Sequence, residues 1–320
     1  MKKEYAVDYE KFIDVNGDRQ NIRVRAAREG LKPILFLHGG PGVADRHNIM
    51  MQQSALAEKY ALVCWDQRGS GKSYRPDIKK EELSLETYIS DAEAVLDYVR
   101  AETGYDRVIV AGHSWGTIIG TPLAARVPEK IAAYIAQGLF VEGAENELLS
   151  WKFCLDEAER TGNKKAINAL SGIRPENGRY PNDKAMMTQR NYLSKFGGGV
   201  WKERKGLVAS LIKPLIKSGE YSPREIINYA SGALYLSQKL WDYAVEQDYT
   251  SITRLEIPVI VTQGVHDYNT PSEIARRWFD RLTAPFKKWI DFEESAHSPI
   301  VEESDKWRIE VEKALSEAGL

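Results

Sequence analysis

The sequence predicts an α/β fold in which a mostly parallel β-sheet carries helices on both faces. Short apolar runs of strand length recur along the 320-residue chain, amphipathic helical runs alternate with several of them, and this alternation stops between residues 142 and 246. Strands that alternate with helices usually pair in parallel, with the helices packed on the sheet. The sequence therefore predicts an α/β core formed by residues 1–141 and 247–320, with an α-helical cap domain inserted at residues 142–246.

The expected strands are apolar runs bounded by turn residues. They cover residues 5–14, 20–27, 33–37, 61–65, 107–111, 131–137, 257–263 and 287–292. The first two should form an antiparallel hairpin around Asn16-Gly17, because this dipeptide tolerates the positive φ angles of tight turns.

Helices are expected within and after this series of strands. One amphipathic run covers residues 87–100 and ends before Gly104, and another covers Glu302–Leu315 near the end of the chain. The side chains expected on the core face of the last helix are Trp307, Ile309, Val311 and Leu315.

The predicted cap contains no convincing strand. Its helical runs cover residues 145–160, 182–195 and 223–244, and the breaks between them contain glycine or proline. Because the segment falls between the sixth and seventh expected strands of the core, it can cover the active site without interrupting the sheet.

Gly112-His113-Ser114-Trp115-Gly116 has the pattern G-x-S-x-G. It follows the expected strand at 107–111 and precedes a helix-compatible run at 117–125, and this context is typical of a nucleophile elbow. The two glycines let strand and helix approach closely, and the tight turn projects the serine hydroxyl above the sheet. The sequence therefore predicts Ser114 as a nucleophile.

A second glycine-rich motif, His38-Gly39-Gly40-Pro41-Gly42, follows the expected strand at 33–37. In folds with a nucleophile elbow, a loop at this position supplies part of the oxyanion hole, because small residues let backbone N–H groups face the substrate. The alternative is a tight loop that binds nothing.

A general base should come late in the chain, since the order in such folds is nucleophile, acid, histidine. The chain has five histidines, which are His38, His47, His113, His266 and His297. Asp267 and His297 each follow an expected strand, 30 residues apart and in the required order. An aspartate after a strand can also be a turn former, and a lone histidine can be a surface residue.

Together these motifs resemble those of the proline iminopeptidase family of α/β-hydrolases. The matching segments are His38–Gly42, Asp66–Ser73 with the pattern DQRGxGxS, Gly112–Gly116, Gly264–Asp267 and Ala296–Ser298. The resemblance implies a two-step acyl transfer with Ser114 as nucleophile, Asp267 as acid and His297 as base. It also implies that the N–H groups of Gly40 and Trp115 form the oxyanion hole. The activity it implies is release of N-terminal residues from small peptides, without a cofactor.

The resemblance leaves the substrate open. Proline iminopeptidases bind the free amine of the substrate with acidic residues of the cap, and no acidic residue of this cap can be matched to them from the sequence. The candidates are Glu145, Glu147, Asp156, Glu157, Glu203, Glu220, Glu225, Asp242 and Glu246. A carboxylesterase or amidase acting on a small uncharged substrate would use the same triad without such an anion.

A catalytically inactive binding module is a third interpretation. The presence of Ser114, Asp267 and His297 together argues against it.

The composition favours a cytoplasmic enzyme without nucleic-acid or membrane partners. The net charge is −2 with no basic stripe, the mean hydropathy is −0.44, and no apolar run approaches the ~18 residues of a membrane span. The start of the chain lacks a signal-type apolar segment. The two cysteines, Cys64 and Cys154, lack metal-site spacing, and Cys64 should be buried and reduced. The glycine loops also lack the G-x-G-x-x-G spacing of nicotinamide sites, so no metal or cofactor is expected.

Overall fold

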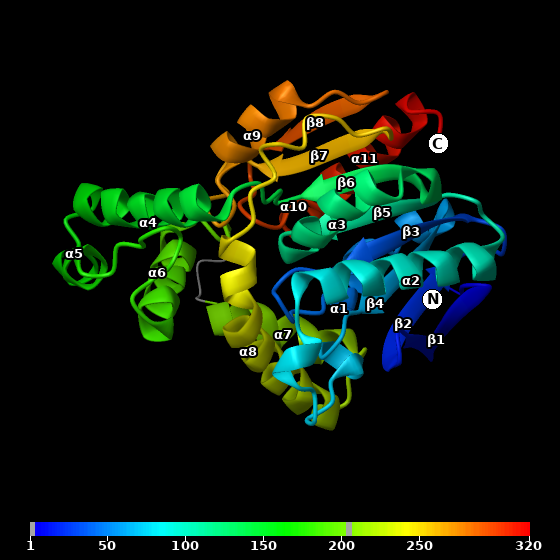
Figure 1. The fold of residues 1–320 in the computed structure, drawn as a ribbon, viewed down its shortest axis with the longest axis horizontal. Coiled ribbons are helices and arrows are strands. Elements are labelled where there is room, and N and C mark those ends of the chain that lie inside the picture. The colour runs from blue at the N-terminus through cyan, green and yellow to red at the C-terminus, as the bar shows by residue number, and fades with distance from the viewer. Residues whose placement is uncertain (1–3, 203–206) are drawn as a thin grey trace.

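The computed structural model describes residues 4–202 and 207–320. Its centre is one eight-stranded sheet with the order β1-β2-β4-β3-β5-β6-β7-β8 (Figure 1). The strands are β1 (Val7–Val15), β2 (Asp18–Ala26), β3 (Lys32–Leu37), β4 (Tyr60–Asp66), β5 (Val108–His113), β6 (Ile131–Gln137), β7 (Val259–Gly264) and β8 (Lys287–Phe292). Pairing is antiparallel between β1 and β2 and between β2 and β4, and parallel from β4 onward. The mostly parallel sheet and its eight expected strands are therefore confirmed.

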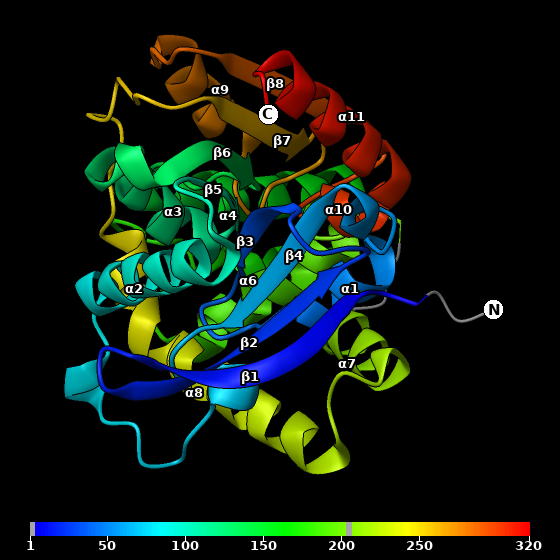
Figure 2. The ribbon, with the colours of Figure 1, turned by 90° about the vertical axis from the view of Figure 1, so that its right-hand side faces the viewer.

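Helices cover both faces of the sheet, as the buried, nearly continuous apolar strands β3 to β6 require. One face packs against α2 (Leu85–Thr103), α3 (Trp115–Arg126) and α9 (Ser272–Arg281). The other packs against α1 (Arg46–Gln52), α10 (Pro299–Glu302) and α11 (Ser304–Glu317). Figure 2 shows these two helical layers on either side of the twisted sheet. Helix α2 ends at Gly104 in the left-handed conformation, at the expected stop.

The expected C-terminal helix differs from the structure in two ways. It is divided into α10 and α11 at Glu303, whose φ of −128° and ψ of 52° are not helical. Ile309 was expected on the core face but is 51% exposed. At about 100° per residue, Ile309 lies on the opposite side of α11 from Trp307 and Val311, which are buried.

Five helices lie between β6 and β7 in the part of the chain that the structure describes, and we refer to residues 143–245 as the helical insertion. They are α4 (Gly143–Arg160), α5 (Lys164–Ser171), α6 (Asp183–Phe196), α7 (Leu207–Ser218) and α8 (Pro223–Val245). In Figure 1 they run from green to yellow on one side of the sheet. Three match the expected helices, with Asn182 and Ser222 accepting N-cap hydrogen bonds at the starts of α6 and α8. Helices α5 and α7 were not expected.

Two further expectations can be compared with the described residues. Cys64 and Cys154 are both buried free cysteines. None of the helices in residues 4–202 and 207–320 is long and apolar enough to cross a bilayer.

Candidate active site

Ser114 lies on the sharp turn between β5 and α3. Its φ of 53° and ψ of −115° are unusual for a residue with a side chain, and such strained conformations are concentrated at functional sites. The flanking glycines are required by space: a Cβ on Gly112 would lie 2.6 Å from the Gly116 carbonyl oxygen, and one on Gly116 would lie 1.9 Å from the Leu37 carbonyl oxygen. The turn thus has the geometry that the G-x-S-x-G pattern predicts.

The loop after β3 approaches this turn. A Cβ added to Gly39 would lie 3.4 Å from the Ser114 Cβ, and the φ of Gly40 is 129°, which glycine alone adopts readily. Trp115 is the first residue of α3, so its N–H has no acceptor within the helix. Gly39, the neighbour of the predicted oxyanion-hole residue Gly40, thus lies against Ser114, and the other predicted residue, Trp115, directly follows Ser114 in the chain.

Gln67 connects these two segments, a role that was not predicted from its sequence context. Its backbone N–H donates to His38 Nε2 at 3.1 Å and its Nε2 donates to the His38 carbonyl oxygen at 3.0 Å. Its Oε1 accepts from Trp115 Nε1 at 3.0 Å. Burial lowers the pKa of His38 to about 4, so the neutral ring accepts from Gln67 and donates from Nδ1 to the Gly39 carbonyl oxygen. The available signal was the position of Gln67 in the DQRGxGxS segment.

Asp267 and His297 come together from the loops after β7 and β8. His297 Nδ1 lies 2.9 Å from Asp267 Oδ2, and the Asp267 side chain is fully buried. The ring of His297 lies at the end of β6, where a Cβ on Gly138 would be 2.9 Å from its Cε1. Ser114 reaches the same place, because its N–H donates to the Gln137 carbonyl oxygen at 3.0 Å. The three predicted residues therefore gather at the carboxyl ends of the parallel strands.

Four further donors hold the Asp267 carboxylate. The N–H groups of Asn269 and Thr270 each donate to Oδ1 at 2.9 Å. The Thr270 hydroxyl and Gln263 Nε2 donate to Oδ2 at 2.9 and 3.0 Å. Thr270 and Gln263 were not predicted, although both lie within four residues of Asp267.

Two other histidines lie near this pair in different surroundings. His113 Nε2 donates to the His297 carbonyl oxygen at 2.9 Å, and burial lowers the pKa of His113 to about 3. His266, which precedes Asp267, instead stacks on Trp201 with ring centroids 3.4 Å apart. The hydrogen bond to Asp267 thus singles out His297, the histidine that chain order predicts.

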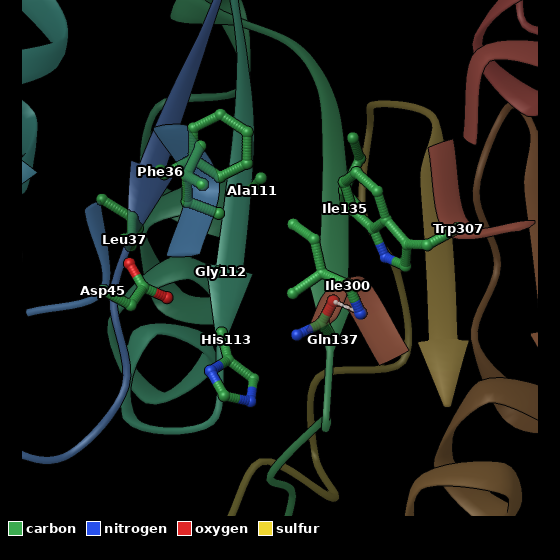
Figure 3. A pocket seen from close by; sticks show the side chains of 11 residues that line it. Phe36, Leu37, Asp45, Ala111, Gly112, His113, Ile135, Gln137, Ile300 and Trp307 are labelled. Atoms are coloured by element: carbon green, nitrogen blue, oxygen red, sulfur yellow. Dashed lines mark hydrogen bonds between the residues drawn. The ribbon is translucent and has the colours of Figure 1, made fainter. Parts of the chain in front are cut away.

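A small cavity lies behind the elbow, between β3, β5, β6 and α10 (Figure 3). It holds about 20 Å³ and is bordered by Asp45, His113 and Gln137 together with apolar side chains. Burial, with Asp66 nearby, raises the pKa of Asp45 to about 7. Ligand pockets usually hold about 300–1,000 Å³, so this cavity is too small for a substrate.

The acidic candidates of the insertion have basic partners. Eight lie among the described residues, each with an arginine or lysine nitrogen within 4.0 Å, and they are Glu145, Glu147, Asp156, Glu157, Glu220, Glu225, Asp242 and Glu246. The ninth, Glu203, lies outside the described residues. Glu147 is 1% exposed and pairs through both oxygens with Arg190. Its neighbour Asn146 donates to the Asn269 carbonyl oxygen at 2.9 Å, which places Glu147 beside the Asp267 loop.

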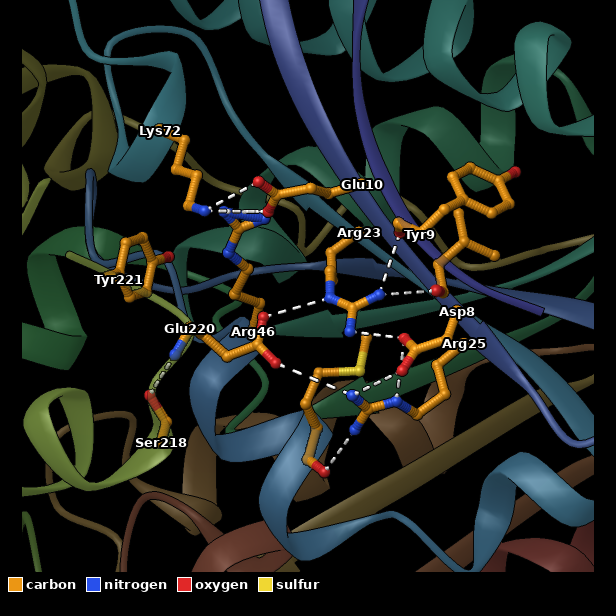
Figure 4. A network of polar contacts seen from close by, with 12 residues as sticks. Asp8, Tyr9, Glu10, Arg23, Arg25, Arg46, Lys72, Ser218, Glu220 and Tyr221 are labelled. Carbon is orange, nitrogen blue, oxygen red and sulfur yellow. Dashed lines mark hydrogen bonds and ion pairs between the residues drawn. The ribbon is translucent and has the colours of Figure 1, made fainter. Parts of the chain in front are cut away.

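Glu220 takes part in a network that joins the insertion to the N-terminal strands (Figure 4). It accepts from Arg23 Nε at 3.1 Å and lies 3.9 Å from Arg25 Nη2. The adjacent Tyr221 donates to Asp66 Oδ2 at 3.4 Å, and the Arg46 guanidinium lies 4.9 Å from its ring centre. The α7–α8 connection is thereby attached to β2 and to the Asp66 segment.

Comparison with known proteins agrees with this architecture. Residues 32–304 match the model of the α/β hydrolase fold family. A probable aminopeptidase, YbaC of Bacillus subtilis, is 27% identical over 92% of both chains. The proline iminopeptidase of Heyndrickxia coagulans is 25% identical over 93% of this chain and 95% of its own.

A solved structure extends the comparison to the fold. The crystal structure of the Mycobacterium smegmatis proline iminopeptidase superposes with a TM-score of 0.58 at 18% identity, covering 97% of this chain and 98% of that chain. At this identity the likeness concerns the fold alone. The chain therefore belongs to the α/β-hydrolase fold family, as a hydrolase that resembles the proline iminopeptidases.

Proposed function

We propose that this hydrolase works through an acyl-enzyme, with Ser114 as nucleophile, His297 as base and Asp267 as its acidic partner. The observation that carries the proposal is the buried 2.9 Å hydrogen bond between Asp267 and His297, at the carboxyl ends of the strands, where the strained Ser114 turn also lies. His297 takes the Ser114 proton as the serine oxygen attacks the scissile carbonyl, and returns it to the leaving group. Water, deprotonated by the same imidazole, then hydrolyses the acyl-enzyme.

The N–H groups of Gly40 and Trp115 are proposed to stabilise the tetrahedral oxyanion. Removing one donor of such a pair usually costs about 3 kcal/mol of transition-state stabilisation. Gln67 supports this arrangement because it hydrogen-bonds both the His38 carbonyl oxygen and Trp115 Nε1. Asp267 orients the imidazole and stabilises the imidazolium that forms in each step.

We further propose that the helical insertion is a cap domain, residues 142–246, and that the preferred substrates are small peptides losing their N-terminal residue. Full-length similarity to an aminopeptidase and a proline iminopeptidase supports this substrate class. Glu147 is the candidate for the substrate amine, since it is buried beside the Asp267 loop. An ammonium group there would share the carboxylate with Arg190.

That same ion pair favours a second candidate, a carboxylesterase or amidase for small uncharged substrates. Arg190 already neutralises Glu147 through two hydrogen bonds of 2.7 and 2.8 Å. A substrate without an ammonium group would leave this pair undisturbed.

A substrate panel separates the two candidates. Free and N-acetylated prolyl and alanyl arylamides are compared with short-chain aryl esters by kcat/KM. An aminopeptidase should prefer the free amines by about 10–10²-fold, because an acetylated substrate loses a charge-assisted hydrogen bond of its ammonium group, worth about 1.5–3 kcal/mol. Equal turnover of free and acetylated arylamides would exclude the aminopeptidase, and cleavage of esters alone would favour the esterase.

A further inference from the structure

A short segment of the helical insertion, residues 197–202, lies across both loops of the proposed acid–base pair. The Gly198 carbonyl oxygen accepts from the N–H of Tyr268 at 2.9 Å, directly after Asp267. The Gly199 carbonyl oxygen accepts from the N–H of His297 itself at 3.3 Å. Two successive carbonyls thus hold one residue on each loop.

The same segment makes further contacts with these loops. Trp201 stacks on His266 with an interplanar angle of 5°, and its N–H donates to Glu302 Oε2 at 2.6 Å. The other oxygen of Glu302 accepts from the N–H groups of Ala296 and Ser298, at 3.0 and 3.4 Å. Glu302 therefore joins residues 197–202 to the two neighbours of His297.

These contacts have a clear geometric consequence. Asp267 and His297 lie on loops beyond the ends of β7 and β8, so the ladder between the strands does not itself set the distance between their side chains. Gly198 and Gly199 are adjacent, and consecutive Cα atoms are about 3.8 Å apart. Their carbonyl oxygens therefore fix the distance between the two N–H groups that donate to them, those of Tyr268 and His297. Displacing residues 197–202 would remove this hold on both loops at once, leaving the direct hydrogen bond from the His266 N–H to the Ser295 carbonyl oxygen at 3.1 Å.

We propose that residues 197–202 act as a positioning strap, which holds the Asp267 and His297 loops in register and couples the helical insertion to catalysis. Gly198 and Trp201 are its positioning residues, and neither is assigned a contact with substrate. The inference rests on the proposed roles of Asp267 and His297, and goes beyond them by giving the insertion a part in the acyl-transfer step itself.

Gly198→Ala is the variant that should disturb residues 197–202 most directly, because the position of Gly198 has no room for a methyl group. A Cβ there would lie 2.6 Å from both Leu193 Cδ1 and Phe153 Cε1. Neither neighbour yields easily: Leu193 is 2% exposed, and Phe153 stacks on Tyr268 with ring centroids 3.9 Å apart. Gly198→Ala should therefore displace either the strap or the Tyr268 ring.

The experiment measures kcat and KM of the full-length protein with p-nitrophenyl acetate, a small ester. Gly198→Ala should lower kcat by about 10–100-fold with KM changed less than about twofold, since small misplacements of catalytic groups have effects of this size. Gly172→Ala is the matched control, because its added Cβ has no atom within 4 Å, and it should keep wild-type kinetics. Melting temperatures of both variants show that the folded protein is being compared.

A second pair of variants tests the strap without adding volume. Trp201→Ala removes the stacking on His266 and should lower kcat about threefold to tenfold, whereas Trp201→Phe keeps an aromatic ring and should restore most of it.

The outcomes separate this inference from the proposed function. A wild-type protein that turns over neither esters nor arylamides contradicts the proposed function itself. An active wild type with kcat unchanged in Gly198→Ala and Trp201→Ala overturns the strap alone. A rise in KM with unchanged kcat would also overturn it, because that result assigns residues 197–202 to substrate binding.

Discussion

The two halves of the candidate site are supported in different ways. The nucleophile and the oxyanion loop follow β5 and β3, neighbouring strands in the middle of the sheet, and Gln67 joins them within the core. The proposed acid and base follow β7 and β8 at one edge of the sheet, and residues 197–202 of the helical insertion hydrogen-bond their loops.

The two halves also differ in whether local sequence or contacts between distant segments determine their structure. The nucleophile half is built from short contiguous motifs whose glycines are required by local space. The acid–base half depends on contacts between segments about 70 to 100 residues apart, such as Gly199 with His297. Changes in the insertion should therefore affect the acid–base half first, and changes near Gln67 should affect the oxyanion half.

The largest expected effect comes from the proposed nucleophile and base. Ser114→Ala and His297→Ala should each lower kcat by about four to six orders of magnitude, and the double variant should be little worse than either, because triad members act as a unit. Steady-state kinetics with an aryl ester checks this. Additive losses in the double variant would show that the two residues do not share a step.

Gln67 tests the oxyanion half. Gln67→Leu removes the side-chain hydrogen bonds to the His38 carbonyl oxygen and from Trp115, and should lower kcat about 10–100-fold by loosening the two N–H donors. Gln20→Leu is the matched control, since Gln20 is equally buried but its side chain hydrogen-bonds Asp91 and Trp65, not His38 and Trp115.

Both glutamine variants should lose about 1–3 kcal/mol of unfolding free energy, measured by urea denaturation. Only Gln67→Leu should lose activity. Equal losses of activity in the two would mean that Gln67 is merely structural.

Thr270 tests the acid–base half with a smaller change. Thr270→Val keeps the shape but removes the hydroxyl that donates to Asp267 Oδ2 at 2.9 Å, so kcat should fall about 2–10-fold. Thr270→Ser retains the hydroxyl and should restore activity. If the serine variant were as slow as the valine variant, packing of the methyl group would be responsible.

The pH dependence of kcat/KM is a further prediction, and it can be measured on the wild-type protein alone. Burial lowers the pKa of His38 and His47 to about 4 and of His113 to about 3, so all three rings stay neutral above pH 5. They bind a proton only in more acidic solution and cannot stop the reaction between pH 7 and 5. The fall of kcat/KM in that range should therefore owe nothing to these three rings. Its slope on logarithmic axes should not exceed about 2, even if Asp45, whose pKa burial raises to about 7, titrates together with one catalytic group. A slope above about 2 would require one of the buried histidines to titrate in the site.

The fold of the core was largely predictable because short-range sequence patterns specify its strands and turns. Periodicity indicated all eight strands, and glycine spacing indicated the Ser114 turn and the Gly40 loop. Chain order alone was enough to favour His297 over His266 as the partner of Asp267, and the 2.9 Å hydrogen bond agrees with that choice. The catalytic roles of these residues stay predictions, as does the division into core and cap domain.

The features that were not predicted correctly either have weak sequence patterns or arise from contacts between distant segments. Helix α5 has only eight residues and α7 contains Pro214, so neither gave a clear helical signal. Ile309 was placed by its apolar character, although the helical period puts it opposite Trp307. The roles of Gln67 and of residues 197–202 arise from tertiary hydrogen bonds that no local pattern predicts.

The central claim is that Ser114 becomes covalently bonded during turnover. Wild-type protein treated with a fluorophosphonate probe, digested and mapped by mass spectrometry should carry one adduct, on Ser114, and its rate of formation should fall by orders of magnitude in His297→Ala. An adduct on another residue, or none on folded and active protein, would contradict the account.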